Sequence, residues 1–213
     1  MDIETDSTDL CKIMAHYGSD TGHPIKSSRL HDYTIFYHGI FSDIKNKNLR
    51  IFELGLGTNN TNIKSNMGVH GKPCASLYGW RHFFPNSMIF GADIDKDILI
   101  TFPKIKTYYC DQTNPKIIEK MWTEPLLREN FDIIIEDGLH TFDANVCFFE
   151  NSIHKLKKNG YYIIEDIHNN DVHLFNDEID KWENAYPNLT FFFVLNIYMK
   201  KEDNNLLVIH YKG

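Results

Sequence analysis

The fold of this chain is decided by a stretch that reads FDIIIEDGLH, from Phe131 to His140, and by a second that reads GYYIIED, from Gly160 to Asp166. Each is an apolar run of the kind that forms a strand buried on both faces of a parallel sheet. Each run ends in acidic residues. Because ligands bind at the carboxyl ends of the strands in open parallel sheets, we expect these acids to lie close together at one edge of the sheet.

Three acids at the ends of these runs, Asp137, Glu165 and Asp166, would repel one another at close range unless a cation lay among them. Oxygen ligands favour a hard ion such as Mg²⁺. His140 follows Asp137 by three residues in a glycine turn and is a candidate general base beside the metal. Successive side chains of a strand point to opposite faces. Both Glu165 and Asp166 can therefore bind the metal only if the chain curls there, and Glu165 is the first to set aside.

Similar apolar runs recur along the chain, at 49–54, 88–93, 105–110, 131–136, 160–165, 190–196 and 206–211. Helical patterns lie between them, at 75–84, 114–122, 141–157 and 171–185. This alternation predicts a doubly wound, Rossmann-like α/β fold with helices on both faces of the sheet. A polar turn at 199–205 separates the last two runs and predicts a C-terminal antiparallel hairpin.

The composition, 42% hydrophobic and 24% charged over 213 residues, is typical of one compact domain with a sizeable core. We expect residues 49–213 to form this domain and residues 1–48 to be an N-terminal extension packed on it. A net charge of −7 gives no indication of a nucleic-acid partner, and no apolar run approaches the ~20 residues of a membrane helix. Four scattered cysteines without metal-like spacing favour a reduced, cytoplasmic protein.

A glycine loop follows the first predicted core strand. Gly55 and Gly57 in this loop let the backbone approach a ligand. A dinucleotide fingerprint would open a helix at once and place an acid about 20 residues further on. Here the polar segment 59–72 intervenes instead, which disfavours a pyrophosphate site. A plain tight turn is the alternative interpretation of the glycines.

Acids also follow the next two predicted strands. Asp93 is placed to accept both hydroxyls of a ribose, the usual role of an acid at this strand end. Asp111 and Gln112, after the third strand, are placed to contact an adenine amino group. Turn capping is the plainer interpretation of the two acids. Together with the glycine loop they indicate a nucleoside site.

These residues lie in motifs whose order and spacing resemble those of class I S-adenosylmethionine-dependent methyltransferases. More narrowly, the chain resembles the macrocin and mycinamicin sugar O-methyltransferase family, with its cephalosporin-hydroxylase-like relatives. The resemblance runs over most of the chain, through YGSDTGH at 17–23, FELGLG at 52–57, ASLYGW at 75–80, FPN at 84–86, GADID at 91–95, DGLH at 137–140 and IED at 164–166.

The resemblance implies a seven-stranded methyltransferase sheet, S-adenosylmethionine as cofactor, and Mg²⁺ held by Asp137, Glu165 and Asp166. It also implies that His140 takes the proton from a sugar hydroxyl. We expect the acceptor to be a small-molecule natural-product sugar, a sugar nucleotide or a polysaccharide. The predicted cofactor-binding residues are Glu53, Gly55, Gly57, Ser76, Asp93, Asp111 and Gln112. Two departures from the family pattern are Leu139, where serine is usual, and Cys74, where glycine is common. The identity of the acceptor and the formation of a homo-oligomer stay open.

Two other functions remain open at this point. A non-haem iron hydroxylase needs two histidines and one carboxylate, which His140, His168 and Asp137 would supply. A non-catalytic nucleoside-binding module is the third hypothesis, although such a module has no need of a base and three acids. For an enzyme, segment 59–72 and the Tyr17–His23 loop are the predicted lid that excludes water.

Overall fold

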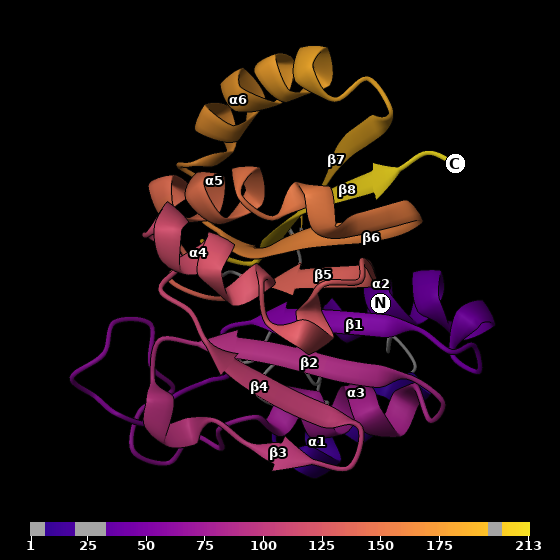
Figure 1. Cartoon of the computed structure of the whole chain (residues 1–213), viewed down its shortest axis with the longest axis vertical. Helices are drawn as coiled ribbons and strands as arrows, with labels where there is room; N and C mark the ends of the chain where they lie inside the picture. Colours follow the sequence, from indigo (N-terminus) through magenta and orange to yellow (C-terminus); the bar gives the residue numbers. More distant parts are fainter. Residues whose placement is uncertain (1–6, 20–32, 196–201) are drawn as a thin grey trace, which may run out of the picture.

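The computed structural model describes residues 7–19, 33–195 and 202–213. Within them, an eight-stranded sheet forms the centre of the molecule (Figure 1). Its strands are β1 (Arg50–Leu54), β2 (Met88–Asp93), β3 (Thr101–Phe102), β4 (Ile105–Tyr109), β5 (Phe131–Glu136), β6 (Leu156–Ile167), β7 (Leu189–Leu195) and β8 (Asn205–Tyr211). The α-helices are α1 (Asp9–Tyr17), α2 (Tyr33–Phe41), α3 (Ala75–Phe83), α4 (Pro115–Trp122), α5 (Phe142–Glu150) and α6 (Val172–Ala185). The 3₁₀ helices are η1 (Ser42–Ile44), η2 (Lys96–Ile98), η3 (Pro125–Leu127) and η4 (Ile153–Lys155).

The strand order is β3-β4-β2-β1-β5-β6-β8-β7. Strands β4, β2, β1, β5 and β6 run parallel, and β8 pairs antiparallel with both β6 and β7. The doubly wound α/β fold and its C-terminal antiparallel hairpin are therefore confirmed. Residues 199–201 of the predicted turn between the last two strands lie outside the described residues.

Alternate residues of the central strands enter two separate cores, which is why these strands are apolar at nearly every position. On β1, Phe52 and Leu54 pack with side chains of α4, α5 and α6, whereas Ile51 packs with those of α1, α2 and α3. In Figure 1 the first set of helices lies in front of the sheet and the second set behind it. Burying a side chain such as Phe52 stabilises the fold by about 1.5–3 kcal/mol.

Two elements differ from the sequence-based expectation. An eighth strand, β3, adds two residues to the outer edge by pairing antiparallel with β4, across a turn in which Lys104 has a φ of 64°. The helix predicted over 141–157 ends at Glu150. Beyond it the chain is tied to its neighbours by Ser152, which accepts from Trp122 Nε1 at 3.1 Å, and by Lys155, whose ammonium donates to the Arg128 carbonyl at 2.7 Å.

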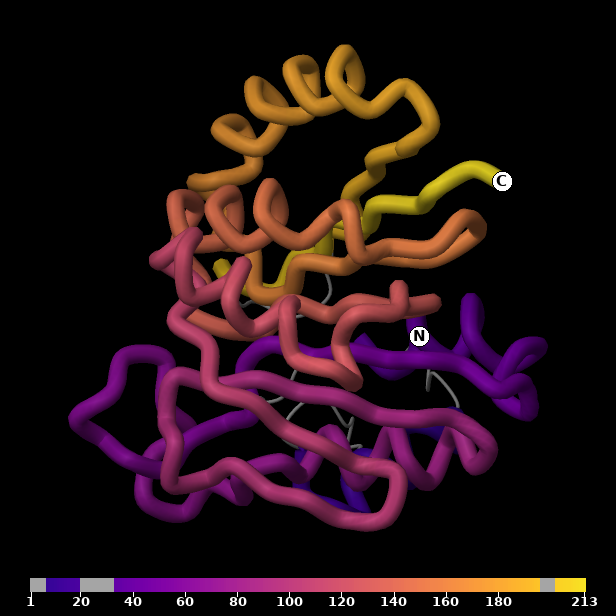
Figure 2. Tube along the Cα trace, in the orientation of Figure 1, coloured from indigo at the N-terminus to yellow at the C-terminus, as the bar shows by residue number. Residues whose placement is uncertain are grey.

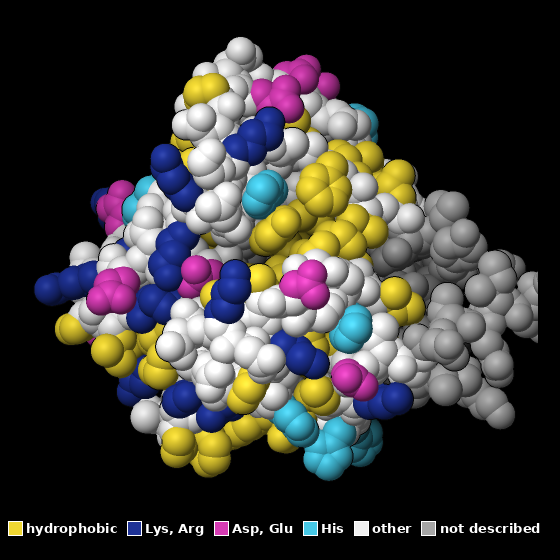
Figure 3. Space-filling model, turned by 90° about the vertical axis from the view of Figure 1, so that its right-hand side faces the viewer, with side chains coloured by type: hydrophobic (Ala, Val, Ile, Leu, Met, Phe, Trp, Pro, Cys, Tyr) yellow, Lys and Arg dark blue, Asp and Glu magenta, His cyan; other side chains and the backbone are white. Residues whose placement is uncertain are grey.

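The N-terminal helices lie on the core. Leu10 and Met14 of α1 and Tyr37 and Phe41 of α2 are fully buried and pack with Trp80 of α3 and its neighbours. None of the helices in the described ranges combines the length and the apolar character that crossing a bilayer demands. The face turned toward the viewer in Figure 3, at the amino ends of the parallel strands, carries hydrophobic side chains among charged ones.

Candidate functional site

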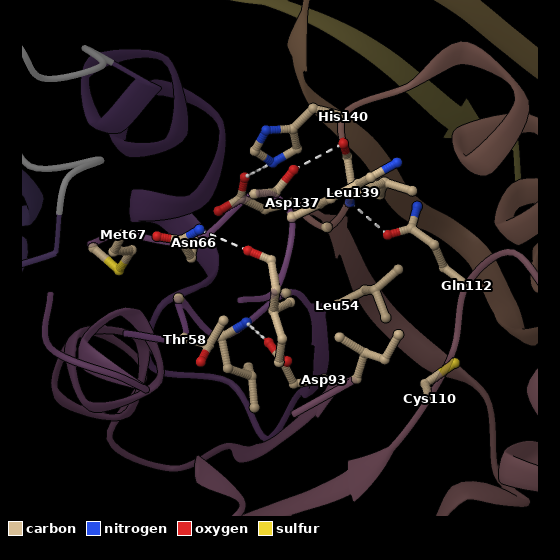
Figure 4. Close-up of a pocket in the computed structure, with 18 of the residues that line it drawn as sticks. Leu54, Thr58, Asn66, Met67, Asp93, Cys110, Gln112, Asp137, Leu139 and His140 are labelled. Carbon is tan, nitrogen blue, oxygen red and sulfur yellow. Dashed lines mark hydrogen bonds and ion pairs between the residues drawn. The ribbon is translucent and has the colours of Figure 1, made fainter. Parts of the chain in front are cut away.

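The sheet has a switch point between β1 and β5, because the chain continues from β1 to β2 and β4 on one side and through β5 and β6 on the other. The connections that follow these two strands diverge and leave a crevice at the carboxyl ends. A cavity of about 690 Å³ opens there (Figure 4). Of the residues predicted from the sequence, its lining includes Gly55, Gly57, Ser76, Asp93, Asp111, Gln112, Asp137, His140 and Asp166.

Asp93 ends β2 at the cavity wall. Its Oδ2 accepts from the Leu56 amide at 2.7 Å and its Oδ1 accepts from the Asp95 amide at 2.8 Å. Burial raises the pKa of this carboxyl, against the lowering effect of those two hydrogen bonds. Each carboxylate oxygen has further lone pairs, so Asp93 can still accept from ligand hydroxyls at the place predicted for a ribose.

Gly55 and Gly57 have φ values of 87° and 71°, the left-handed region. A Cβ atom on Gly55 would lie 1.8 Å from the carbonyl oxygen of Asp137, and one on Gly57 would lie 2.1 Å from the Met67 sulfur. Both glycines line the cavity. Both also allow neighbouring atoms to come closer than a side chain would permit. The left-handed backbone of the two glycines is compatible with either interpretation of this loop, a turn or a ligand site.

Gln112 braces the turn that carries the acid and the histidine. Its Oε1 accepts from the Leu139 amide at 2.7 Å, and its Nε2 donates to Glu136 at 3.3 Å. A Cβ on Gly138 would lie 1.8 Å from that Oε1, so glycine makes room for the brace. Asp111 caps its own turn by accepting from the backbone amide and the hydroxyl of Thr113, at 3.0 and 2.7 Å.

Glu53 is 3% exposed and is not part of the cavity lining. Its carboxylate accepts from the Ser76 hydroxyl and, at 2.5 Å, from Trp80 Nε1. These bonds fasten α3 to the end of β1 and so set the position of Ser76, which does line the cavity. The structure thus places Glu53 beneath the predicted cofactor site instead of on its surface.

At the other end of the cavity, Asp137, His140 and Asp166 each present one potential metal-binding atom within 4.8 Å of the other two. His140 Nε2 lies 2.9 Å from Asp137 Oδ1, and its Nδ1 lies 3.5 Å from Asp166 Oδ2. The left-handed backbone of His140, with a φ of 58°, turns the ring back over the strand end. Figure 4 shows the ring of His140 beside the carboxylate of Asp137.

Glu165 and Asp166 face different surroundings. The chain does curl at the end of β6, since Asp166 has a φ of 56° and the pairing with β8 shifts register between Ile164 and Ile167. Asp166 thereby reaches the cavity. Glu165 is 2% exposed, lies outside the cavity lining and accepts a hydrogen bond from the Tyr37 hydroxyl. Burial, followed by the nearby charge of Asp137, raises the pKa of Glu165 well above its usual range.

The charge of His140 balances the acids around it. Burial by itself would lower the pKa of His140, but its hydrogen bond to Asp137, with the charges of Asp137 and Asp166, raises that pKa to about 10. The imidazolium is then the cation between two carboxylates. Carboxylate oxygens held this close are the ligands that Mg²⁺ prefers, so this donor set fits the ion implied by the family resemblance.

Segment 59–72 covers one side of the cavity, between β1 and α3, and Figure 2 shows it as a long excursion at the carboxyl-end side of the sheet. Ser65 donates its hydroxyl to the Leu139 carbonyl at 2.9 Å, and the Met67 amide donates to the Thr58 carbonyl at 2.8 Å. The predicted lid segment thus contacts the turn formed by residues 137–140. Of the predicted Tyr17–His23 loop, Ser19 lines the cavity, whereas 20–23 lie outside the described residues.

His168 does not join the group around His140. Its Nε2 lies 3.1 Å from a carboxylate oxygen of Glu202, and it is not among the residues that line the cavity. In the described part of the chain, the group whose geometry could hold a metal ion consists of one histidine and two carboxylates. This composition departs from the two histidines and one carboxylate of the iron hydroxylase hypothesis.

Two residues near the site were not predicted from the sequence. Tyr33 and Tyr37, on α2, donate hydrogen bonds to Asp166 and Glu165. Burial is the main cause that raises the pKa of both hydroxyls well above the usual range, so both keep their protons. The available signal was a pair of tyrosines four residues apart in a mostly apolar helix, where phenylalanine would fill the core equally well.

A doubly wound sheet with an antiparallel last pair and a cavity at its switch point defines the class of fold: the chain has the class I methyltransferase fold. It aligns over 97% of its length with 55% of the MycE methyltransferase of the mycinamycin biosynthetic pathway, solved in complex with Mg, SAH and mycinamycin VI, with a TM-score of 0.73 and 21% identity. No family model matches the chain.

Sequence relatives narrow the class. The chain is 30% identical to demethylmacrocin O-methyltransferase of Streptomyces fradiae over 145 residues. This aligned length is 67% of this chain and 33% of that protein. It is also 30% identical over 139 residues, 65% of this chain and 32% of the relative, to mycinamicin VI 2''-O-methyltransferase of Micromonospora griseorubida. The resemblance to the macrocin and mycinamicin sugar O-methyltransferases is therefore confirmed, and the chain spans about a third of the length of these relatives.

Proposed function

We propose that this chain is an S-adenosylmethionine-dependent O-methyltransferase that acts on a sugar hydroxyl with the help of Mg²⁺. The observation that supports it most is that one cavity joins Asp93, the predicted ribose ligand, to the group formed by Asp137, His140 and Asp166. A methyl donor bound at the first end would direct its sulfonium toward an acceptor held at the second. The sugar-methylating relatives named above support a glycosylated small molecule as acceptor, and a sugar nucleotide is another acceptor class expected from the sequence.

In this proposal Asp137 and Asp166 hold the cation, and Glu165, held from behind by Tyr37, is the third acid of the site. A divalent cation bound there would orient the acceptor hydroxyl and lower its pKa. His140 takes the hydroxyl proton, the oxygen forms a bond to the methyl carbon, and the carbon–sulfur bond breaks. The base has to be neutral, and the positive charge among the acids is then supplied by the cation.

Binding and turnover test the proposal separately. Calorimetry should show that the protein binds S-adenosylhomocysteine, and incubation with S-adenosylmethionine, Mg²⁺ and a panel of free, nucleotide-linked and natural-product sugars should yield a methyl ether. Product formed without oxygen would exclude the hydroxylase hypothesis. Binding without transfer to any sugar of the panel would contradict the proposed activity and favour the nucleoside-binding module.

A further inference from the structure

The side of the acidic group that faces away from the cavity is formed by α2. Tyr33 and Tyr37 are both fully buried and stand one helical turn apart, with ring centroids 6.4 Å apart. The hydroxyl of Tyr37 donates to Glu165, and that of Tyr33 donates to Asp166 Oδ1 at 2.6 Å. Helix α2 therefore supports two consecutive acids that come from the far end of the chain.

Tyr33 makes a second bond to the same residue. Its hydroxyl oxygen accepts from the Asp166 backbone amide at 3.2 Å, so side chain and backbone of Asp166 are both held by one hydroxyl group. Asp166 needs such support because its left-handed φ of 56° is a conformation that costs a residue with a side chain about 1–3 kcal/mol. The two bonds to Tyr33 stabilise the curl that brings Asp166 into the cavity.

The hydrogen bonds to Tyr33 determine which carboxylate oxygen of Asp166 faces the cavity. Oδ1 is engaged by Tyr33, whereas Oδ2 faces His140 Nδ1 at 3.5 Å, on the cavity side. We propose that Tyr33 is a positioning residue for the metal site, which fixes Asp166 so that Oδ2 alone is presented to the cation. This inference rests on the proposed function, since it concerns the same divalent ion.

The expected size of the effect follows from the chemistry of supported ligands. Hydrogen bonds that orient a ligating carboxylate typically change metal affinity or activity by about 10–100-fold when they are removed. Tyr33→Phe removes both bonds to Asp166 while keeping the buried ring. Tyr161→Phe is the matched control. Tyr161 lies on β6, the strand that carries Asp166, and its ring stacks on that of His210 with centroids 4.6 Å apart. Within the described residues its hydroxyl makes no hydrogen bond to Asp166 or to another side chain.

The experiment is Mn²⁺ binding to the full chain saturated with S-adenosylhomocysteine, followed by electron paramagnetic resonance. Tyr33→Phe should raise the Kd for Mn²⁺ by about tenfold or more, whereas Tyr161→Phe should leave it unchanged. Affinity for S-adenosylhomocysteine without metal should be the same in all three proteins. In turnover, Tyr33→Phe should raise the Mn²⁺ concentration needed for half-maximal rate while kcat at saturating metal recovers, a split that a merely structural role would not give.

Two results would overturn the inference in different ways. A folded Tyr33→Phe variant with the wild-type Kd for Mn²⁺ would remove the role of Tyr33 and leave the proposed function intact. A wild-type protein that binds no Mn²⁺ would remove the metal-assisted function and the inference together. If Tyr33→Phe does not fold, 4-methylphenylalanine at position 33, which keeps the para substituent but not the donor, gives the same comparison against 4-aminophenylalanine, which restores a donor and should restore metal affinity.

Discussion

Single carboxyl groups of this site are held by neutral donors. Backbone amides of Leu56 and Asp95 hold Asp93, and the Tyr37 hydroxyl holds Glu165. Because burial raises the pKa of both acids, each keeps its proton to a higher pH than an exposed carboxyl of the same type. Residue by residue, the site is therefore sensitive to pH and to the loss of one hydrogen-bonding partner.

Asp93 should make cofactor binding pH-dependent. A ribose hydroxyl donates better to the carboxylate than to the acid, so affinity for S-adenosylhomocysteine should fall as pH falls through the raised pKa of Asp93, starting above the ordinary value of about 3.9. Asp93→Asn should bind at least about tenfold more weakly, about 1.4 kcal/mol, and lose this pH dependence. Calorimetry at several pH values measures both, with the exposed Asp97→Asn as control. Unchanged affinity in folded Asp93→Asn would refute the ribose assignment.

His140 should be required for the chemical step. His140→Ala should lower kcat by about 100-fold or more, because the proposed proton acceptor is lost, while affinity for S-adenosylhomocysteine stays nearly intact. His168→Ala, which removes a histidine paired with Glu202 outside the cavity, should keep the wild-type rate. Steady-state kinetics with the identified sugar acceptor provide the measurement. A His140→Ala enzyme with wild-type kcat would mean that water or another residue takes the proton.

Gly55 should tolerate no side chain. Its φ of 87° and the Cβ position 1.8 Å from the Asp137 carbonyl oxygen force the backbone of two strands apart, so Gly55→Ala should lower the free energy of unfolding by roughly 1–3 kcal/mol or more. Gly39→Ala is the control: that position lies inside α2 with no atom within 4 Å of a new Cβ, and the change should stabilise by about 0.5–1 kcal/mol. Urea unfolding of both variants decides, and equal stabilities would contradict the prediction.

Among the elements, β6 and segment 59–72 shape the site most. The last residues of β6 leave regular strand geometry to place Asp166, and segment 59–72 lines the cavity beside the 137–140 turn. The segment is fastened to that turn by the hydrogen bond from Ser65 to Leu139. Elements whose tertiary contacts are few open locally before the rest of the fold.

Ser65→Ala should therefore loosen segment 59–72 specifically. One hydrogen bond contributes about 1 kcal/mol, so amides of this segment should exchange with deuterium roughly fivefold faster if they exchange by local opening, with the core strands unaffected. Thr61→Ala, in the same segment and exposed, is the control and should exchange like the wild type. Equal exchange in the two variants would show that Ser65 does not hold the segment.

Sequence patterns predict those elements whose conformation depends on residues near in sequence. The strands from β1 to β8, apart from β3, are recognisable because β-branched and aromatic runs are bounded by polar turns, and acids at two parallel strand ends were expected to meet. The end of α5 was missed because Ser152 and Lys155 are held by residues far away in sequence. The contact of Tyr33 with the site could not be predicted for the same reason, since its hydrogen bond to Asp166 spans 133 residues.

For the molecule as a whole, cation binding should increase the free energy of unfolding. The native acidic group presents its ligands together only when folded, so Mg²⁺ at about 100 times its Kd should stabilise the fold by about 2.7 kcal/mol. The melting temperature should rise with Mg²⁺, and EDTA should return it to the metal-free value while abolishing methyl transfer. Asp137→Asn should remove the Mg²⁺ response. A melting temperature and a rate that ignore both Mg²⁺ and EDTA would refute the metal.

The central place of β1 has a consequence for biosynthesis. β1 is completed by β2 on one side and by β5 on the other, and the bond from the Arg50 amide to Asp132 spans 82 residues. A nascent chain that has emerged only through β4 therefore exposes one apolar edge of β1 until the ribosome has delivered β5. Non-local parallel pairing of this kind folds slowly, and unpaired edges aggregate. During the interval between the synthesis of these two strands, this unpaired edge is open to aggregation.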